Sequence, residues 1–224
     1  MDVVAACAVG FSEVLVGFPF LTAKVLMQND RKWFGLPIKR YYQGVKYPFF
    51  SSVGFNMVVF PLKERFYPYT QSYWLSGALT GLCVAPQMFF IDTYTIRRQT
   101  NQSVRLSMFR GCKGFGMTVA RESVALSTYF GVYHKVRENH NSFFAGGVAG
   151  LANWTTSFPL DTIRTRQIAQ RCSIVEAAKQ KKFWRGFSVA ATRAVLVNAV
   201  SFTVFEKCLS YLNGPKRNYQ SKIM

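Results

Sequence analysis

Six stretches of the chain are rich in apolar residues, and the pattern predicts a helix in each. Most of them approach the roughly 20 residues that an α-helix needs to cross a bilayer, although the second is short. Polar or charged residues interrupt these stretches, so hydropathy alone fits the buried helices of a soluble protein equally well. The stretches cover residues 3–22, 47–62, 73–94, 115–133, 142–163 and 187–212.

The positions of the basic residues favour membrane spans. The chain has 28 Lys and Arg against 10 Asp and Glu, which makes the formal net charge +18. Bases are frequent in the loops after the first, third and fifth stretches and sparse in the two shorter loops between them. Bases on alternate loops are typical of a protein that crosses a membrane several times. A nucleic-acid-binding module has no reason to separate its charges in this way, so we expect no nucleic acid partner.

Two patterns recur three times, which predicts three helix pairs. In the odd-numbered stretches, two small residues four positions apart allow close helix packing, and a proline position follows. The proline positions are Pro19, Phe90 and Pro159, at intervals of 71 and 69 residues. The glycines that precede the even-numbered stretches are Gly44, Gly114 and Gly186, at intervals of 70 and 72 residues. We therefore expect repeats at 1–70, 71–140 and 141–224, the last with a basic C-terminal tail.

The segment Phe158–Gln167, FPLDTIRTRQ, places a proline, an acid and two bases at the end of an apolar stretch. Ionisable groups are costly in lipid, so they usually face a protein or water interior. Pro-x-Asp-x-x-Arg-x-Arg resembles the signature of the mitochondrial carrier family, and with the threefold spacing the resemblance covers residues 3–212. Family repeats are longer, so the loop helices should be shortened or absent here. In this compactness the chain resembles a carrier encoded by a giant DNA virus.

The resemblance implies an all-α membrane protein with six transmembrane helices, arranged as three pseudo-repeats of helix pairs around a central cavity. It also implies a multi-pass carrier of the mitochondrial inner membrane that works by alternating access, with its basic loops in the matrix. Pro19 and Pro159 would kink two of the odd-numbered helices. Cardiolipin would bind at the starts of the loop helices, and the carrier would act as a monomer without a cofactor.

In the family, a base of one repeat pairs with an acid of its neighbour and closes the matrix side. The same rule gives two ion pairs here, with Gln28 as a brace of this matrix gate. The third link has lost both charges, which avoids an isolated charge in a poorly solvated site. The expected pairs are Lys24 with Asp161 and Arg164 with Asp92, and the uncharged link joins Leu21 to Thr95.

The resemblance places a cytoplasmic gate near the ends of the even-numbered stretches, where fewer charges are in register. Arg137 is the one cation in register, and its expected partner is Glu206 or Glu64. His134 replaces an acid, and we expect it to pack or to form hydrogen bonds, with a pH-sensitive gate as the alternative. This side should close less tightly than the matrix side.

Arg121 and Arg193 lie within apolar stretches and favour an anionic group on the solute, since unpaired cations there are expensive. Glu122 leaves two alternatives open, because a base followed by an acid resembles amino-acid carriers but also allows simple neutralisation of Arg121. The features that are similar to ADP/ATP carriers are the segment Tyr129–Tyr133, Lys63 and Ser157. Further expected solute contacts are Ser51 and Ser52.

A nucleotide or similar phosphorylated anion is therefore the first candidate solute, and an amino acid held by Arg121 and Glu122 is the second. A degenerate carrier that acts as a membrane scaffold is the third interpretation, because both gates have lost charges. The chain has no Walker-type phosphate loop and no His/Cys set with metal-site spacing, so we expect neither an enzyme nor a bound metal. Its five widely spaced cysteines indicate no disulfide framework.

Overall fold

The computed structural model describes residues 2–104, 113–194, 196–197, 200 and 204 of the 224-residue chain. This part contains helices and no strand, which confirms the all-α class. The long helices are α1 (Asp2–Gln28), α3 (Lys46–Thr70), α4 (Tyr73–Gln99), α5 (Phe115–Arg137) and α6 (Ser142–Gln170), and the short ones are α2 (Ile38–Tyr41) and α7 (Ile174–Lys179). Residues 187–194 are also helical, and much of the rest of the sixth stretch lies outside the described residues.

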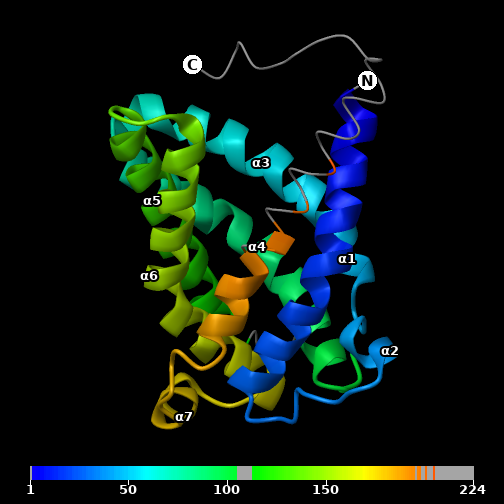
Figure 1. Ribbon diagram of the computed structural model, residues 1–224. Coiled ribbons are helices and arrows are strands. Elements are labelled where there is room, and N and C mark those ends of the chain that lie inside the picture. Colours follow the sequence, from blue (N-terminus) through cyan, green and yellow to red (C-terminus); the bar gives the residue numbers. More distant parts are fainter. Residues whose placement is uncertain (1, 105–112, 195, 198–199, 201–203, 205–224) are drawn as a thin grey trace, which may run out of the picture.

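The long helices run up and down in a bundle (Figure 1). α5 lies between α4 and α6 and packs against both, and α3 packs against α4. The turns that join α3 to α4 and α5 to α6 lie at one end of the bundle, whereas α2 and α7 lie at the other (Figure 1). The expected repeat boundaries fall within or beside these two turns, and the division into three repeats itself stays a prediction.

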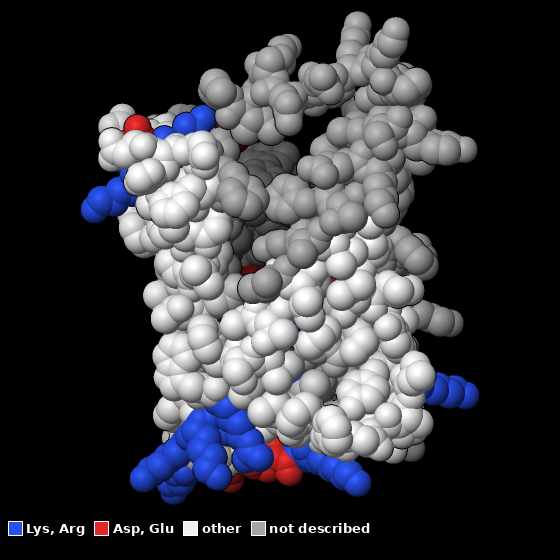
Figure 2. Space-filling view, viewed as in Figure 1, with Lys and Arg blue, Asp and Glu red and all other residues white. Residues whose placement is uncertain are grey.

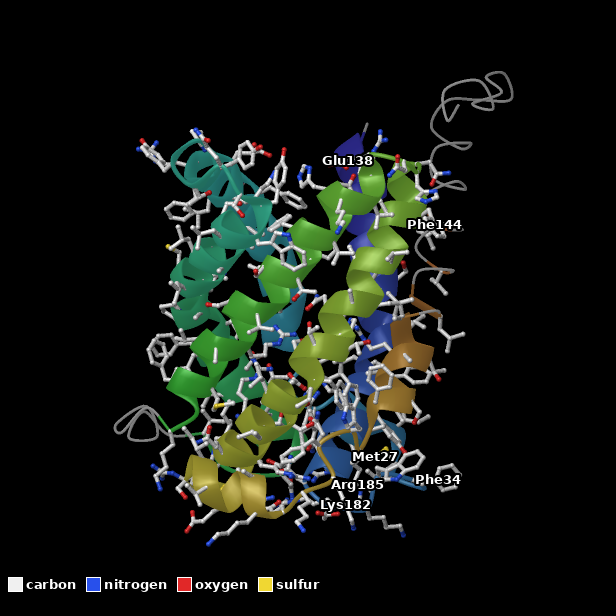
Figure 3. All side chains as sticks on the ribbon, turned by 90° about the vertical axis from the view of Figure 1, so that its left-hand side faces the viewer. Met27, Phe34, Glu138, Phe144, Lys182 and Arg185 are labelled. Atoms are coloured by element: carbon white, nitrogen blue, oxygen red, sulfur yellow. The ribbon has the colours of Figure 1, made fainter. Side chains whose placement is uncertain are left out.

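Basic side chains gather at the end of the bundle that carries α2 and α7, which we call the basic end. Figure 2 shows a cluster of Lys and Arg side chains there. In Figure 3, Lys182 and Arg185 lie at the basic end with Met27 and Phe34, whereas Glu138 and Phe144 lie at the opposite end. The charge that the sequence assigns to alternate loops is therefore collected on one side of the molecule.

By length and apolar character, Tyr73–Gln99 is the one helix in the described part of the chain that could cross a membrane. The count of six transmembrane helices therefore stays a prediction. α1, α4 and α6 continue past their apolar stretches and end at Gln28, Gln99 and Gln170. The acids and bases of the signatures therefore stand on helical faces inside the bundle and not in the loops.

The three glycines that precede the even-numbered stretches share a left-handed backbone conformation, with φ of +90°, +93° and +90°. L side chains rarely adopt this conformation, which explains why glycine recurs there. A Cβ atom added to each glycine would also lie within 4 Å of α1, α4 or α6, at the position where the signature places its base. The contacts are Gly44 with Thr95, Gly114 with Arg164 and Gly186 with Lys24. One contact thus recurs three times in the bundle, at the spacing of the sequence pattern.

Close packing of α4 on α5 depends on two of the small residues that the sequence pattern singled out. A Cβ atom added to Gly77 would lie 2.5 Å from the carbonyl oxygen of Leu126, and one added to Gly81 would lie 2.5 Å from Cα of Ser123. Both distances are shorter than any normal contact. Glycine therefore allows the two backbones to meet, as small residues do in membrane helix pairs.

Pro19 lies inside α1 and Pro159 inside α6, at the expected kink positions. A proline has no N–H to donate to the carbonyl oxygen four residues earlier. For Pro19 this oxygen belongs to Leu15, and the hydroxyl of Tyr42 donates to it at 2.7 Å. Tyr42 therefore satisfies the oxygen that the proline leaves free and ties α1 to the segment before α3.

The loop helices are short, as the sequence predicts, with four residues in α2 and six in α7. Much of the middle loop, residues 105–112, lies outside the described residues. α7 begins with a capping box, in which Ser173 and Glu176 each accept a hydrogen bond from the other's backbone N–H. These hydrogen bonds lower the pKa of Glu176 below its ordinary value.

Arg166, which the sequence pattern places among the loop bases, is fully buried on α6. Its guanidinium donates to the carbonyl oxygens of Gln28, Ala177 and Lys181, at 2.9, 3.2 and 2.7 Å. These carbonyls lie at the C-terminal ends of α1 and α7 and just beyond α7, where helical acceptors lack partners. Arg166 therefore joins three segments at the basic end and is not a solvated loop charge.

Candidate functional site

The acids and bases of the repeated signatures meet near the basic end, on α1, α4 and α6. Nζ of Lys24 lies 2.5 Å from Oδ2 of Asp161, and Nη1 of Arg164 lies 2.5 Å from Oδ2 of Asp92. These are the two ion pairs expected from the sequence. The side chain of Asp92 is 20% exposed, whereas those of the other three residues are 7% exposed or less.

Arg164 joins the two ion pairs into one network. Its Nη2 atom lies 2.8 Å from Oδ1 of Asp161 on the same helix, while Nη1 contacts Asp92 on α4. The side-chain amide of Gln28 donates to Asp161 and to Thr162, each at 3.1 Å. Polar contacts therefore hold α1, α4 and α6 together at one level, in surroundings where an unpaired charge would be costly.

α5 contributes a third base and a third acid. Nη1 of Arg121 lies 2.5 Å from Oε1 of Glu122, whose side chain is 1% exposed. The same oxygen lies 3.5 Å from Nη1 of Arg164, and Nε of Arg121 lies 3.9 Å from Oδ1 of Asp161. Three acids and three bases are thus in contact, with a formal net charge of zero. We call this group the charge network: Lys24, Asp92, Arg121, Glu122, Asp161 and Arg164.

Glu122 was expected either to bind an amino-acid solute or to neutralise Arg121. In this conformation it neutralises Arg121. Neither residue was predicted from the sequence to contact the ion pairs of the signatures. Their spacing along the chain carries no sign of the contact, because α5 is not one of the helices that bears a signature. The contact depends on how α5 is placed between α4 and α6.

A hydrogen bond between two side chains spans the link that has no charges. Gln99 of α4 donates from Nε2 to Oγ1 of Thr22 on α1 at 3.1 Å. Gln28 makes the corresponding bond from α1 to α6. Gln99 was not predicted from the sequence, although it occupies the same place in the second signature as Gln28 in the first.

Two aromatic residues of α6 lie beside the charge network, and neither was predicted from the sequence to be there. Nζ of Lys24 lies 4.8 Å from the ring centroid of Trp154 and 5.2 Å from that of Phe158. Cζ of Arg121 lies 6.0 Å from the Trp154 centroid. Cations within about 6 Å of an aromatic face are attracted to it. Trp154 therefore contacts bases from two different helices.

A cavity of about 260 Å³ lies beside the charge network, lined by residues that include Arg193, Asp92 and the uncharged pair Leu21 and Thr95. Nε of Arg193 donates to the carbonyl oxygen of Gly17 at 3.2 Å. Arg193, an expected solute contact, therefore shares a cavity with the most exposed acid of the network. The loss of the third ion pair leaves uncharged residues in the lining of this cavity.

The three serines that were expected to contact the solute have no described contact with this cavity. Ser157 is buried, and its hydroxyl donates to the carbonyl oxygen of Asn153 at 2.7 Å. Ser51 and Ser52 belong to α3, but their side chains are outside the described part of the structure. None of these three serines supplies a described contact to the charge network.

Lys63, expected in the solute cavity, lies instead with residues expected at the cytoplasmic gate. Its Nζ atom lies 2.7 Å from Oε1 of Glu64 and 3.4 Å from Nε2 of His134. The His134 ring stacks on Tyr73, with 7° between the ring planes, and Tyr73 stacks in turn on Tyr67. His134 therefore packs against an aromatic ring and makes a polar contact with Lys63. The cluster joins α3, α4 and α5 at the end opposite the basic end.

The expected ion pair between Arg137 and Glu64 is not formed. Arg137 is exposed and donates from Nη1 to the carbonyl oxygen of His140 at 3.3 Å, whereas Glu64 pairs with Lys63. The neighbouring base competes for this acid because it stands next to it in the chain. Glu206, the other expected partner of Arg137, lies outside the described residues.

Comparison with known proteins gives one consistent picture. The sequence profile described as "Mitochondrial carrier protein" matches residues 137–216. The mitochondrial arginine transporter BAC2 of Arabidopsis thaliana is 26% identical over 264 residues, with 91% of this chain and 88% of the relative covered. The mitochondrial basic amino acids transporter of Bos taurus is 25% identical, with 96% and 93% covered. The glutamate/glycine mitochondrial carrier ymc1 of Schizosaccharomyces pombe is also 25% identical, with 92% of each chain covered.

These similarities extend over nearly the whole chain, and the aligned length of 264 residues exceeds the 224 residues present here. The relative therefore contains segments that this chain lacks, in agreement with its short loop helices. The profile match, the relatives and the paired signatures agree: the chain is similar over nearly its whole length to solute transporters of the mitochondrial carrier family, which are multi-pass proteins of the mitochondrial inner membrane.

Proposed function

We propose that this carrier transports an amino acid, with a cationic amino acid such as arginine as its preferred solute. Two of the relatives described above are named for arginine or basic amino acids, and a third for glutamate and glycine. The nucleotide that the sequence analysis placed first has no support in these names. The amino acid that it placed second, on the basis of Arg121 and Glu122, is consistent with them.

The observation that carries this proposal is the presence of opposite charges at one cavity. Arg193 and Asp92 line the same space of about 260 Å³, with Arg164 also in its wall. An amino acid has a carboxylate that complements an arginine and an ammonium group that complements an aspartate. Pockets for drug-sized ligands have about 300–1,000 Å³, so the space favours a solute smaller than a nucleotide.

Transport would follow from two gates at opposite ends of six helices, arranged as three repeats. In the described conformation, the charge network and the braces Gln28 and Gln99 join the helices near the basic end, and we interpret this arrangement as a closed matrix gate. When the helices tilt apart, the ions would exchange their partners for water. The cluster of Lys63, Glu64 and His134 would then contribute to closure at the cytoplasmic end. We place cardiolipin at the basic end and treat the carrier as a monomer.

Reconstitution of the full chain into liposomes tests this proposal. We expect uptake of labelled arginine, and we expect Arg193→Ala to abolish it, because the variant removes the cation that would hold the carboxylate. Lys39→Ala, an exposed base in the first basic loop, is the matched control and should leave uptake unchanged. Uptake of nucleotides without amino acids would show that the proposal is wrong. A well-folded preparation that moves no solute would favour the scaffold.

A further inference from the structure

α1 carries an acid, Glu13, in the middle of its apolar stretch. Glu13 belongs to none of the repeated sequence patterns and lies outside the charge network. It is half-buried and interacts electrostatically with Arg193 of the helical segment 187–194. An ionisable group inside an apolar membrane helix is expensive, so it usually faces the protein interior and marks the path of a solute or ion.

Glu13 lies on the face of α1 that lines the cavity. Residues 13, 17, 21 and 24 are three or four positions apart, so they form one stripe along the helix. Leu21 and Lys24 line the cavity, and the carbonyl oxygen of Gly17 accepts the hydrogen bond from Arg193. The stripe therefore leads from the charge network past Arg193 to Glu13, away from the basic end.

Gly17 brings Arg193 close to the backbone of α1. A Cβ atom added to Gly17 would lie 3.0 Å from Nε of Arg193, so the glycine leaves room for the guanidinium. Glu13 stands one helical turn before Gly17, about 6 Å along the helix axis. A base and an acid thus meet the same stripe about one turn apart, a separation that the long side chain of arginine or lysine can span.

The acids of the charge network are less accessible to a solute than Glu13. Glu122 lies 2.5 Å from Arg121 and Asp161 lies 2.5 Å from Lys24, and the side chains of both acids are at most 2% exposed. A solute reaches either acid only after a base of the network has moved away. Glu13 is half-buried outside the network, so a solute cation can approach it while the ion pairs near the basic end stay in place.

The charges of a cationic amino acid match the groups around this stripe. In the proposed function, Arg193 holds the carboxylate of the solute and Asp92 complements its ammonium group. With a neutral solute side chain, Glu13 and the solute carboxylate share the one guanidinium of Arg193. With a cationic side chain, Glu13 gains a second positive charge, and such attraction is strong where water is largely excluded.

We propose that Glu13 binds the cationic group at the end of the solute side chain and makes the carrier prefer cationic amino acids to neutral ones of the same shape. The inference rests on the proposed transport of amino acids and deepens it, because it assigns the residue that selects the side chain. A site discriminates between two solutes by the difference between its affinities for them. Arginine and a neutral analogue differ at the group that would face Glu13.

Uptake of arginine and of citrulline into liposomes tests the inference, because citrulline replaces the guanidinium by a neutral group of similar shape. Initial rates over a range of concentrations give KM and the maximal rate for each solute. We expect the unmodified chain to have the lower KM for arginine. Glu13→Gln should raise that KM by about 10- to 100-fold, the effect of one hydrogen bond to a charged group. The KM for citrulline should stay the same, which also shows that the variant folds.

Three further variants serve as controls. Glu13→Asp keeps the charge and should keep the preference for arginine. Glu138→Gln removes the same charge from an exposed position at the end opposite the basic end (Figure 3), and it should change neither KM. Glu13→Gln combined with Arg193→Gln removes both charges of the pair. If the pair only stabilised the helices, this double variant would recover arginine uptake, whereas a binding role predicts that it takes up neither solute.

Four results would overturn the inference: equal KM values for the two solutes in the unmodified chain, an unchanged preference for arginine in Glu13→Gln, equal loss of both solutes in that variant, or recovery of arginine uptake in the double variant. Each of them leaves amino-acid transport in place as long as the unmodified chain takes up arginine or citrulline. If the unmodified chain takes up neither but transports another solute, the proposed function is wrong and this inference is wrong with it.

Discussion

Asp161 is the acid on which the charge network depends most. It lies 2.5 Å from Lys24, 2.8 Å from Arg164 and 3.9 Å from Arg121, and its side chain is 2% exposed. Asp92, in contrast, has Arg164 as its one ion-pair partner among the described residues, and its side chain is 20% exposed. We therefore expect Asp161→Asn to destabilise the protein much more than Asp92→Asn, although both variants remove one negative charge.

The size of the stability loss expected for Asp161→Asn follows from the distances of its ion pairs and from their burial. At an effective dielectric constant of about 20, unit charges 2.5 Å apart attract by roughly 6–7 kcal/mol. Desolvation of the ions offsets part of this energy, and the removal of one partner from a buried ion pair costs about 3–5 kcal/mol in measured cases. For a chain of this size about 1 kcal/mol corresponds to about 2–4 °C in Tm. We expect a decrease of about 6–20 °C for Asp161→Asn and a few degrees for Asp92→Asn.

Thermal unfolding of the full chain in detergent, followed by the fluorescence of its four tryptophans, measures these shifts. Asp30→Asn is the control, because Asp30 pairs with Arg185 at the surface, where its side chain is 49% exposed. An exposed ion pair contributes about 1 kcal/mol or less, so the control should change Tm by less than about 4 °C. Equal shifts for Asp161→Asn and either of the other variants would refute the importance given to the buried network.

Three further predictions concern separate contacts. Exchange of the charges of Lys24 and Asp161 should restore uptake in liposomes only in part relative to the single variants, because position 161 also contacts a second base on its own helix. Gly186→Ala should lower the free energy of unfolding by about 1–3 kcal/mol, because φ is +90° there, and denaturant unfolding measures the loss. Ser173→Ala should lower Tm slightly at neutral pH. The hydrogen bonds of Ser173 lower the pKa of Glu176, so this loss should shrink as acid protonates the glutamate.

Each of these predictions has a result that contradicts it. Full recovery of uptake by the exchanged pair would mean that Lys24 and Asp161 act as an isolated pair. Gly116→Ala is the control for Gly186→Ala, since a Cβ atom at Gly116 meets no described atom within 4 Å and its φ is not positive. Equal losses for the two glycines would remove the argument from backbone conformation. A larger effect of Ser173→Ala in acid than at neutral pH would contradict the capping box.

Much of the candidate matrix gate could be predicted from sequence, because its residues repeat at intervals close to the length of one helix pair. The pairs Lys24–Asp161 and Arg164–Asp92 follow from the spacing of the signatures together with a family rule for neighbouring repeats. The three glycines with left-handed φ were found in the same way. A repeated pattern can be detected in the sequence because equivalent residues occupy equivalent structural positions in each copy.

Contacts without a repeated pattern were not predicted. Gln99 was overlooked although its spacing was informative, and Trp154 was overlooked because no pattern distinguishes it from other aromatic residues. Lys63 was assigned to the cavity by resemblance, but the structure shows it with Glu64 and His134 at the opposite end. The contacts of a single base in an apolar helix depend on which residues of neighbouring helices pack against the same helix face. The position of the base in the sequence does not specify those residues.

The sequence by itself determined the all-helical class and the segregation of charge to alternate loops, because both depend on composition or on spacing along the chain. The two ion pairs followed from the same spacing together with the rule that the family resemblance implies. The tertiary structure alone decided that Arg121 and Glu122 join those pairs. Their contacts with Arg164 and Asp161 depend on the rotation and position of α5 relative to α6. Packing of whole helices sets that geometry, and no local pattern in the chain encodes it.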